Sequence, residues 1–165
     1  MGKLSERGGR LMRVAATAAA AAGGALAAGV VIGMTARLLM SAITVAAAEE
    51  STFTAAGTAG VMMVFTVLAV PAAVTAVAPA VVRVAGRWVT AAVTGWGMAT
   101  NGFADGAAVI LAPDSRMSLI VVIVVAFGAT VVAHGMFAQF VARRLAERLA
   151  GAPATTPLPG TTAPA

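Results

Sequence analysis

Residues 117–142 read MSLIVVIVVAFGATVVAHGMFAQFVA and contain no Asp, Glu, Lys or Arg. A membrane helix needs about 20 apolar residues to cross roughly 30 Å of hydrocarbon, so this stretch is long enough to span a bilayer. Three similar stretches precede it, separated by short clusters of charge: residues 14–48, 55–82 and 88–112. The sequence therefore predicts an all-α fold, an integral membrane bundle of four helices.

Composition separates this chain from soluble proteins. Hydrophobic residues make up 60% of it and charged residues 10%, whereas charged residues form about a quarter of a typical soluble domain. We expect one membrane domain at 14–150, after a basic cytoplasmic N-terminus at 1–13 and before a disordered Pro/Thr-rich tail at 151–165. The chain has no cysteine, which excludes disulfides and thiolate metal sites, and no cofactor is expected.

Basic residues gather on one side of the expected spans. Lysine and arginine near the ends of membrane helices are retained in the cytoplasm. Both termini are therefore predicted to be cytoplasmic, in a bacterial inner membrane. The scattered charges do not indicate nucleic-acid binding. The predicted cytoplasmic side carries Lys3, Arg7, Arg10, Arg13, Arg83, Arg87, Arg143, Arg144 and Arg148, and the outer side carries Glu49, Glu50, Asp114 and Arg116.

The first apolar stretch is longer than a membrane requires. It continues for about 35 residues, well beyond the ~7–15 of a secretory signal core, so we expect it to be retained. As a helix it would be roughly 50 Å long, and it must tilt strongly or project from the bilayer. In the second stretch, Pro71 predicts a kink, and the hydroxyls of Ser51, Thr52 and Thr54 predict a capped helix start.

Small residues recur at four-residue spacing on two of the expected helices, a pattern that lets helix backbones approach closely. The first set is Ala25, Gly29 and Gly33, and the second is Gly102 and Gly106. We expect both faces to pack inside the bundle. Association of two copies through the first span is the alternative, because a small bundle leaves much helix surface exposed.

Three ionisable residues, Arg37, Asp105 and His134, fall within or near apolar segments. Burying a charge in hydrocarbon costs at least about 2.5–3.5 kcal/mol, so each needs a partner or water. Asp105 lies about 10 Å below the outer boundary, at a depth open to Arg37, so these two are predicted to pair. His134 lies about 25 Å deep, too far for a catalytic pair with Asp105, and is expected to be a neutral core histidine bonded to a hydroxyl.

A polar stripe marks the third helix. It consists of Thr90, Thr94, Asn101 and Asp105. Their helical spacing places them on one face, which should point into the bundle. We interpret the stripe as a structural hydrogen-bond network, with a water-filled path or a ligand site as the alternative. The Asn-Gly pair at 101–102 also allows a broken helix there.

Residues 33–40 read GMTARLLM, and residues 50–58 read ESTFTAAGT. Together they resemble a group of small multi-pass bacterial membrane proteins of uncharacterised activity, in which an arginine- and methionine-containing first helix leads to an acidic residue, a Phe-Thr pair and a Gly-Thr pair. The resemblance covers about residues 25–70 and implies no activity. It draws attention to Arg37, Phe53, Thr54, Gly57 and Thr58.

The sequence carries no GxSxG, HExxH or GK[ST] motif, so hydrolase, zinc-protease and P-loop chemistry lack support. We expect no catalytic residues and no metal ligands. The favoured function is that of a non-enzymatic inner-membrane protein, an accessory or structural component of an assembly, in contact with lipid and with a partner membrane protein or a second copy. An intramembrane enzyme is the least favoured alternative. A small ion or proton channel or transporter ranks between them, using Arg37, Thr94, Asn101, Asp105 and His134.

Overall fold

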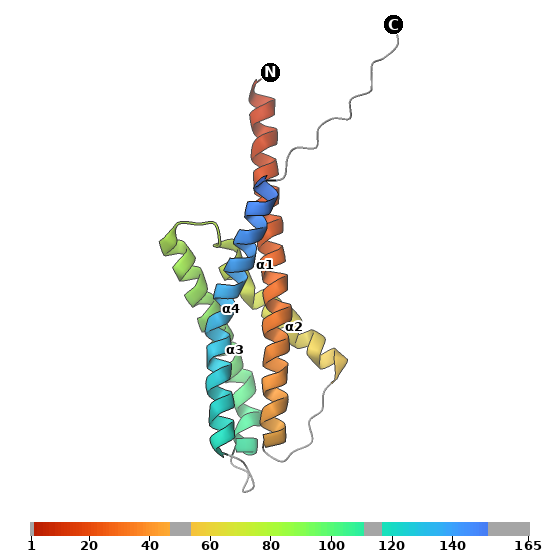
Figure 1. The fold of residues 1–165 in the computed structure, drawn as a ribbon, viewed down its shortest axis with the longest axis vertical. Coiled ribbons are helices and arrows are strands. Elements are labelled where there is room, and N and C mark those ends of the chain that lie inside the picture. The colour runs from red at the N-terminus through yellow and green to blue at the C-terminus, as the bar shows by residue number, and fades with distance from the viewer. Residues whose placement is uncertain (1, 47–53, 111–116, 152–165) are drawn as a thin grey trace.

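The computed structural model describes the backbone of residues 2–46, 54–110 and 117–151, and the side chains of residues 7–45, 54–100 and 117–151. The described chain is helical and contains no β-strand. Its elements are α1 (Gly2–Ala46), α2 (Ala55–Val74), α3 (Ala80–Ile110) and α4 (Met117–Gly151), shown in Figure 1. The predicted all-α fold with four helices is confirmed.

Three of the helices are long and apolar enough to cross a membrane, over Arg7–Val45, Ala55–Val74 and Met117–Gly151. This fits the predicted membrane bundle. The fourth expected span, 88–112, continues past the side chains that the structure describes and remains a prediction. The basic N-terminal segment belongs to α1, which begins at Gly2. The tail expected to be disordered lies beyond Gly151, outside the described residues.

α1 is an uninterrupted helix of 45 residues. Its middle is rich in alanine, the residue with the highest helix propensity, and it contains no proline. Threonine hydroxyls within it donate to the carbonyl oxygen four residues earlier, from Thr17 to Arg13 at 3.0 Å and from Thr35 to Val31 at 2.9 Å. These polar groups are therefore satisfied within the helix itself.

α2 begins at a cap and ends before the expected limit. The Thr54 hydroxyl accepts a hydrogen bond from the Gly57 amide at 3.2 Å, which confirms the predicted helix start. α2 contains Pro71 but ends at Val74, although the apolar stretch had indicated an end near residue 82. α3 begins at Ala80. The expected bounds of 55–82 and 88–112 for the second and third spans therefore differ from the helices.

The turn between α2 and α3 is itself apolar, which is why hydropathy did not reveal it. Residues 75–79 read TAVAP. At the end of α2 the Thr75 hydroxyl donates to the Pro71 carbonyl at 2.8 Å. The Pro79 carbonyl accepts from the Arg83 amide at 3.0 Å and starts α3, at a point where helix amides have no intrahelical partner and a proline is tolerated. Arg83 and Arg87, whose charge indicates a loop between the second and third expected spans, therefore lie within α3.

α1 packs along α2 and α4, and α3 packs on α2 and α4. Small residues form the contacts of α1. A Cβ atom at Gly24 would lie 2.6 Å from the Ala142 Cβ, one at Gly29 would collide with Thr66, and one at Gly33 would lie 2.9 Å from the Met62 Cα. The main core is made of alanines from α1, α2, α4 and the α2–α3 turn: Ala21, Ala25, Ala28, Ala69, Ala72, Ala73, Ala76, Ala138 and Ala142.

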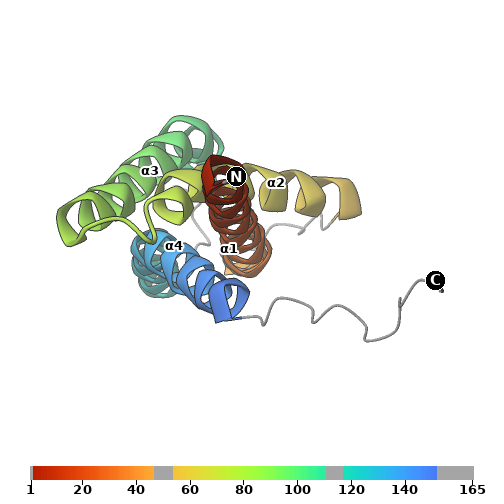
Figure 2. The same ribbon diagram turned by 90° about the horizontal axis from the view of Figure 1, so that it is seen from above.

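The first set of predicted packing residues thus lies inside the bundle. Ala25 belongs to the core that joins α1 to α2 and α4, and Gly29 and Gly33 face α2. The side chains at the second set, Gly102 and Gly106, lie outside the described residues. Figure 2 shows α1 bordered by α2 on one side and by α4 on the other.

α1 and α4 continue beyond α2 and α3 at the end of the molecule where α1 begins and α4 ends (Figure 1). Residues 7–19 of α1 are all exposed except Ala16, and burial begins only at Ala20. We refer to residues 7–19 as the α1 extension. It is a helical projection that the core of the bundle does not cover.

Reporter fusions test the predicted topology. Alkaline phosphatase, which is active only outside the cytoplasm, should be active when fused at Ser51 or Ser115 and inactive when fused after Ala78 or Ala165. The reason is that basic residues flank both termini and the α2–α3 turn. Green fluorescent protein at the same sites should give the complementary signal. Phosphatase activity at Ala165 would require an odd number of spans.

Candidate functional site

Gln139 of α4 is the centre of a buried polar network. Its side chain is 1% exposed. The Arg87 Nε atom donates to Gln139 Oε1 at 2.6 Å, and Gln139 Nε2 donates to the Arg83 carbonyl at 2.7 Å and to the Thr75 hydroxyl at 3.2 Å. One amide therefore ties α4 to α3 and to the turn that follows α2.

Two glycines let these groups meet. A Cβ atom at Gly135, one turn before Gln139, would lie 3.2 Å from both the Arg87 Cα and its carbonyl oxygen. A Cβ atom at Gly86 would collide with the Thr75 hydroxyl. Both positions are buried. A larger residue at either position would push apart the segments that Gln139 joins.

His134 lies deeper in the bundle and is fully buried. Its Nδ1 atom is 3.3 Å from the Thr94 hydroxyl oxygen of α3, and its ring packs against Phe65 of α2 with centroids 5.3 Å apart and planes tilted by 54°. The Nε2 atom makes no hydrogen bond to the described residues. The histidine is therefore a core residue held by a hydroxyl, and one ring nitrogen has no hydrogen-bond partner there.

Thr90 and Thr94 are one turn apart on the inward face of α3, and both are fully buried. The Thr90 hydroxyl accepts from the Ala72 amide at 3.1 Å, directly after Pro71. A proline disturbs the helix ladder around it, and hydroxyl groups of neighbouring helices can bond the affected backbone. Thr90 therefore bonds the backbone of α2, and Thr94 bonds His134 of α4. The side chains of Asn101 and Asp105 lie outside the described residues.

Arg37 lies at the other end of α2. Its Nη2 atom would be 3.7 Å from a Cβ atom at Gly57, in the first turn of that helix. His134 contacts Phe65, which lies about 12 Å further along α2 by the helical rise. The structure therefore places Arg37 and His134 at different levels. The predicted partner of Arg37, Asp105, falls outside the described side chains, so the pair stays a prediction.

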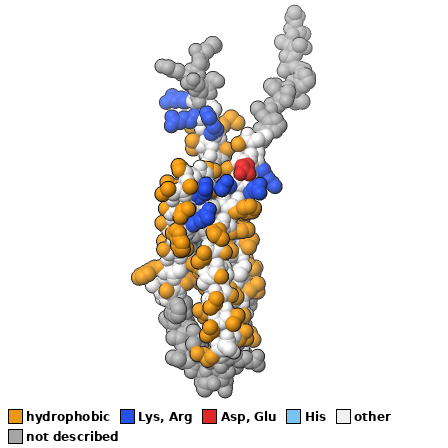
Figure 3. All heavy atoms as spheres, turned by 60° about the vertical axis from the view of Figure 1, so that its left-hand side comes forward, with side chains coloured by type: hydrophobic (Ala, Val, Ile, Leu, Met, Phe, Trp, Pro, Cys, Tyr) orange, Lys and Arg blue, Asp and Glu red, His pale blue; other side chains and the backbone are white. Residues whose placement is uncertain are grey.

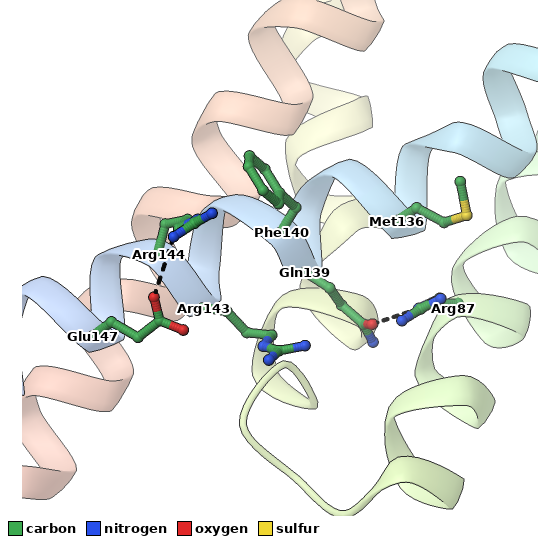
Figure 4. A pocket seen from close by; sticks show the side chains of 7 residues that line it. All are labelled: Arg87, Met136, Gln139, Phe140, Arg143, Arg144 and Glu147. Atoms are coloured by element: carbon green, nitrogen blue, oxygen red, sulfur yellow. Dashed lines mark hydrogen bonds and ion pairs between the residues drawn. The ribbon is translucent and has the colours of Figure 1, made fainter.

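A cavity of about 360 Å³ opens beside Gln139, on the side of Arg87. Arg144 and Glu147 approach to 3.7 Å as an exposed ion pair, and the Arg144 guanidinium lies 5.4 Å from the centre of the Phe140 ring. Figure 3 shows Arg side chains gathered over this end of the bundle and its projection. The cavity, shown in Figure 4, is lined by Arg87, Met136, Gln139, Phe140, Arg143, Arg144 and Glu147.

Neither Gln139 nor the bonds it forms stand out as a site in the sequence. A glutamine inside an otherwise apolar helix was the available signal, because an amide in such a setting requires partners. Two of those partners were hidden: the Arg83 carbonyl is a backbone group, and Thr75 stood in a stretch interpreted as continuous helix. Arg87 was assigned to a loop for its charge alone.

No protein family, no characterised protein and no solved structure matches this chain. The resemblance over residues 25–70 therefore stays a prediction. Within the described ranges, no three His, Cys, Asp or Glu side chains gather as the ligands of a metal ion would. The chemistry of the site rests on arginine, amide, hydroxyl and imidazole groups.

Replacing Gln139 with leucine tests the network. The variant keeps the side-chain volume but leaves the Arg87 Nε and the Arg83 carbonyl without their partner. We expect the free energy of unfolding in detergent to fall by roughly 1–3 kcal/mol. The control Val125→Leu, at a position 66% exposed on the same helix, should change it by less than about 0.5 kcal/mol. Equal losses in the two variants would show that Gln139 does not hold the helices together.

Proposed function

We propose that the protein is a non-enzymatic component of a membrane assembly, in which the bundle is the anchor and the α1 extension is the surface that a partner binds. The observation that carries this proposal is the length of α1 compared with the thickness of a bilayer. At 1.5 Å per residue its 45 residues extend roughly 68 Å, about twice the ~30 Å of hydrocarbon.

The packing of α1 against α4 indicates how deeply α1 lies in the bilayer. Gly24 lies against Ala142, and Arg143 and Arg144 follow directly on α4. Guanidinium groups are far more stable at the membrane surface than in hydrocarbon, so this contact belongs near the surface. From Gly24 to the end of α1 at Ala46, the helix covers roughly 33 Å, which matches the hydrocarbon thickness. The α1 extension then lies outside the hydrocarbon, on the side where α1 begins and α4 ends.

The chemistry of the α1 extension supports a protein partner. Leu11, Met12 and Val14 are 68%, 76% and 62% exposed. Each gains about 1.5–3 kcal/mol when its side chain is removed from water. A helix that mixes exposed apolar and basic residues suits a partner with an apolar groove and an acidic rim. The basic residues of the extension are Arg7, Arg10 and Arg13.

Photo-crosslinking in cells tests this proposal. A photoreactive amino acid at Met12 should give a discrete protein adduct, because the partner covers this position. The same amino acid at Val125, on the exposed apolar surface of α4, should contact lipid and give none. The double variant Leu11→Ser, Met12→Ser, with the probe moved to Val14, should lose the adduct.

The mass of the adduct identifies the kind of assembly. An adduct of twice the chain mass would make the partner a second copy, and any other discrete mass would make it a different protein. A lack of adducts at Leu11, Met12 and Val14 together would contradict the proposal. Adducts of equal yield at Met12 and Val125 would contradict it as well.

A proton or ion pathway is the second candidate. The observation in its favour is the line of buried polar side chains, Gln139, Thr90, Thr94 and His134, between α3 and its neighbours. Asp105 would extend the same stripe by its spacing on α3. Against a pathway, most of these polar groups already bond to one another or to the backbone, as a structural network requires.

Reconstitution distinguishes the two functions. Purified protein in liposomes with a pH-sensitive dye should show no flux above that of empty liposomes, because the described polar groups stabilise the helix contacts. Asp105→Asn keeps the shape of the side chain and removes its charge, so it should behave like the wild type. Proton or ion flux that the wild type supports and Asp105→Asn abolishes would establish the pathway instead.

A further inference from the structure

The cavity beside Gln139 combines arginine side chains with an apolar groove. We propose that it binds the phosphate headgroup of an anionic membrane phospholipid, with one acyl chain in the groove between α3 and α4. This inference concerns the end of the bundle that carries Arg87 and Arg143. It is independent of the partner proposed for the α1 extension.

Arg87 is fixed in place but still has donors to offer. Its Nε atom donates to Gln139 Oε1 at 2.6 Å, and among the described residues its two terminal nitrogens make no hydrogen bond. Figure 4 shows that Gln139 lies between Arg87 and Arg143. A guanidinium held by one edge is preorganised to bind phosphate oxygens through the other, which is the geometry that favours arginine in phosphate sites.

The positive charge of the cavity is not neutralised by the protein groups that the structure describes there. Glu147 pairs with Arg144 at 3.7 Å. Arg143 makes no ion pair or hydrogen bond within the part of the chain described. Arg87 and Arg143 therefore line the same cavity without a carboxylate partner among the described residues. An anion bound in this cavity would offset their charge, and the lower dielectric at a membrane surface strengthens that attraction.

The walls of the cavity distinguish a lipid from a free anion. Met136 and Phe140 are 50% and 57% exposed beside the arginines. A second cavity, of about 120 Å³, shares Arg87 and Met136 with the first and continues along α3 and α4. Its other lining residues are Val84, Trp88, Ala91 and Val132.

The direction of this groove fits an acyl chain. Ala91 lies one turn after Arg87 on α3, and Val132 lies one turn before Met136 on α4, so the groove leads from the charged end toward the middle of the bundle. Trp88, 65% exposed at its edge, is a residue type enriched at membrane surfaces. Basic pockets between membrane helices are known to bind lipid phosphates. Inorganic phosphate would use only the arginines and leave the groove empty.

Native mass spectrometry of the delipidated full-length protein tests the proposal, with phosphatidylglycerol and phosphatidylcholine as probes. We expect phosphatidylglycerol to bind roughly tenfold more tightly, because its net negative charge complements the guanidinium groups of Arg87 and Arg143. Arg143→Gln should remove most of this preference without affecting folding, since Arg143 bonds no described residue. Arg87→Gln should remove it too, although this change also disturbs the Gln139 network.

Matched controls separate a site from general charge attraction. Arg10→Gln lowers the net charge of the chain equally but lies in the α1 extension, so it should keep the preference. Excess inorganic phosphate should displace little phosphatidylglycerol. Three outcomes would each overturn the proposal: equal binding of the two lipids, equal loss in Arg10→Gln and Arg143→Gln, or full displacement by inorganic phosphate, which would show that a free anion is the ligand.

Discussion

The close approach of α1 to α2 and α4 is the constraint on which the rest of the structure depends. In a bilayer, lipid tails are as apolar as leucine, so helices associate through tight packing and hydrogen bonds instead of the hydrophobic effect. Gly24, Gly29 and Gly33 bring the α1 backbone against Ala142, Thr66 and Met62. Because α1 contacts both α2 and α4, it fixes the position of α4 along the axis of α2.

That position decides which polar groups meet. With α4 in this register, Gln139 lies opposite the turn after α2, and His134 lies opposite Thr94. Buried polar groups without partners cost about 1–3 kcal/mol each. Any other register of the helices would break these bonds and is therefore disfavoured. Packing of small residues and bonding of polar residues therefore specify one arrangement together.

The interior of the bundle and its charged end differ in how their polar side chains are bonded. Deep in the bundle, hydroxyl groups bond to backbone and imidazole, as Thr90 and Thr94 do. At the end that carries Arg87 and Arg143, guanidinium groups exceed the carboxylates that the structure places near them. Internal bonding thus satisfies the polar groups of the interior, whereas the charged end carries the arginines of the proposed lipid site. The α1 extension, which is the proposed partner surface, continues from this end.

Local sequence determined the fold class, the cap at Thr54, the packing face at Gly29 and Gly33, and the inward direction of Thr90 and Thr94. Each of these follows from hydropathy, side-chain volume or helical spacing within one segment. The structure placed the turn at 75–79, because hydropathy does not separate those residues from the helices beside them. It also decided the Gln139 network, because a glutamine, a hydroxyl and a backbone carbonyl far apart in the chain become partners only when α4 crosses the end of α2. Such a meeting depends on the register between helices, which is the sum of many close contacts and has no signature in any one segment.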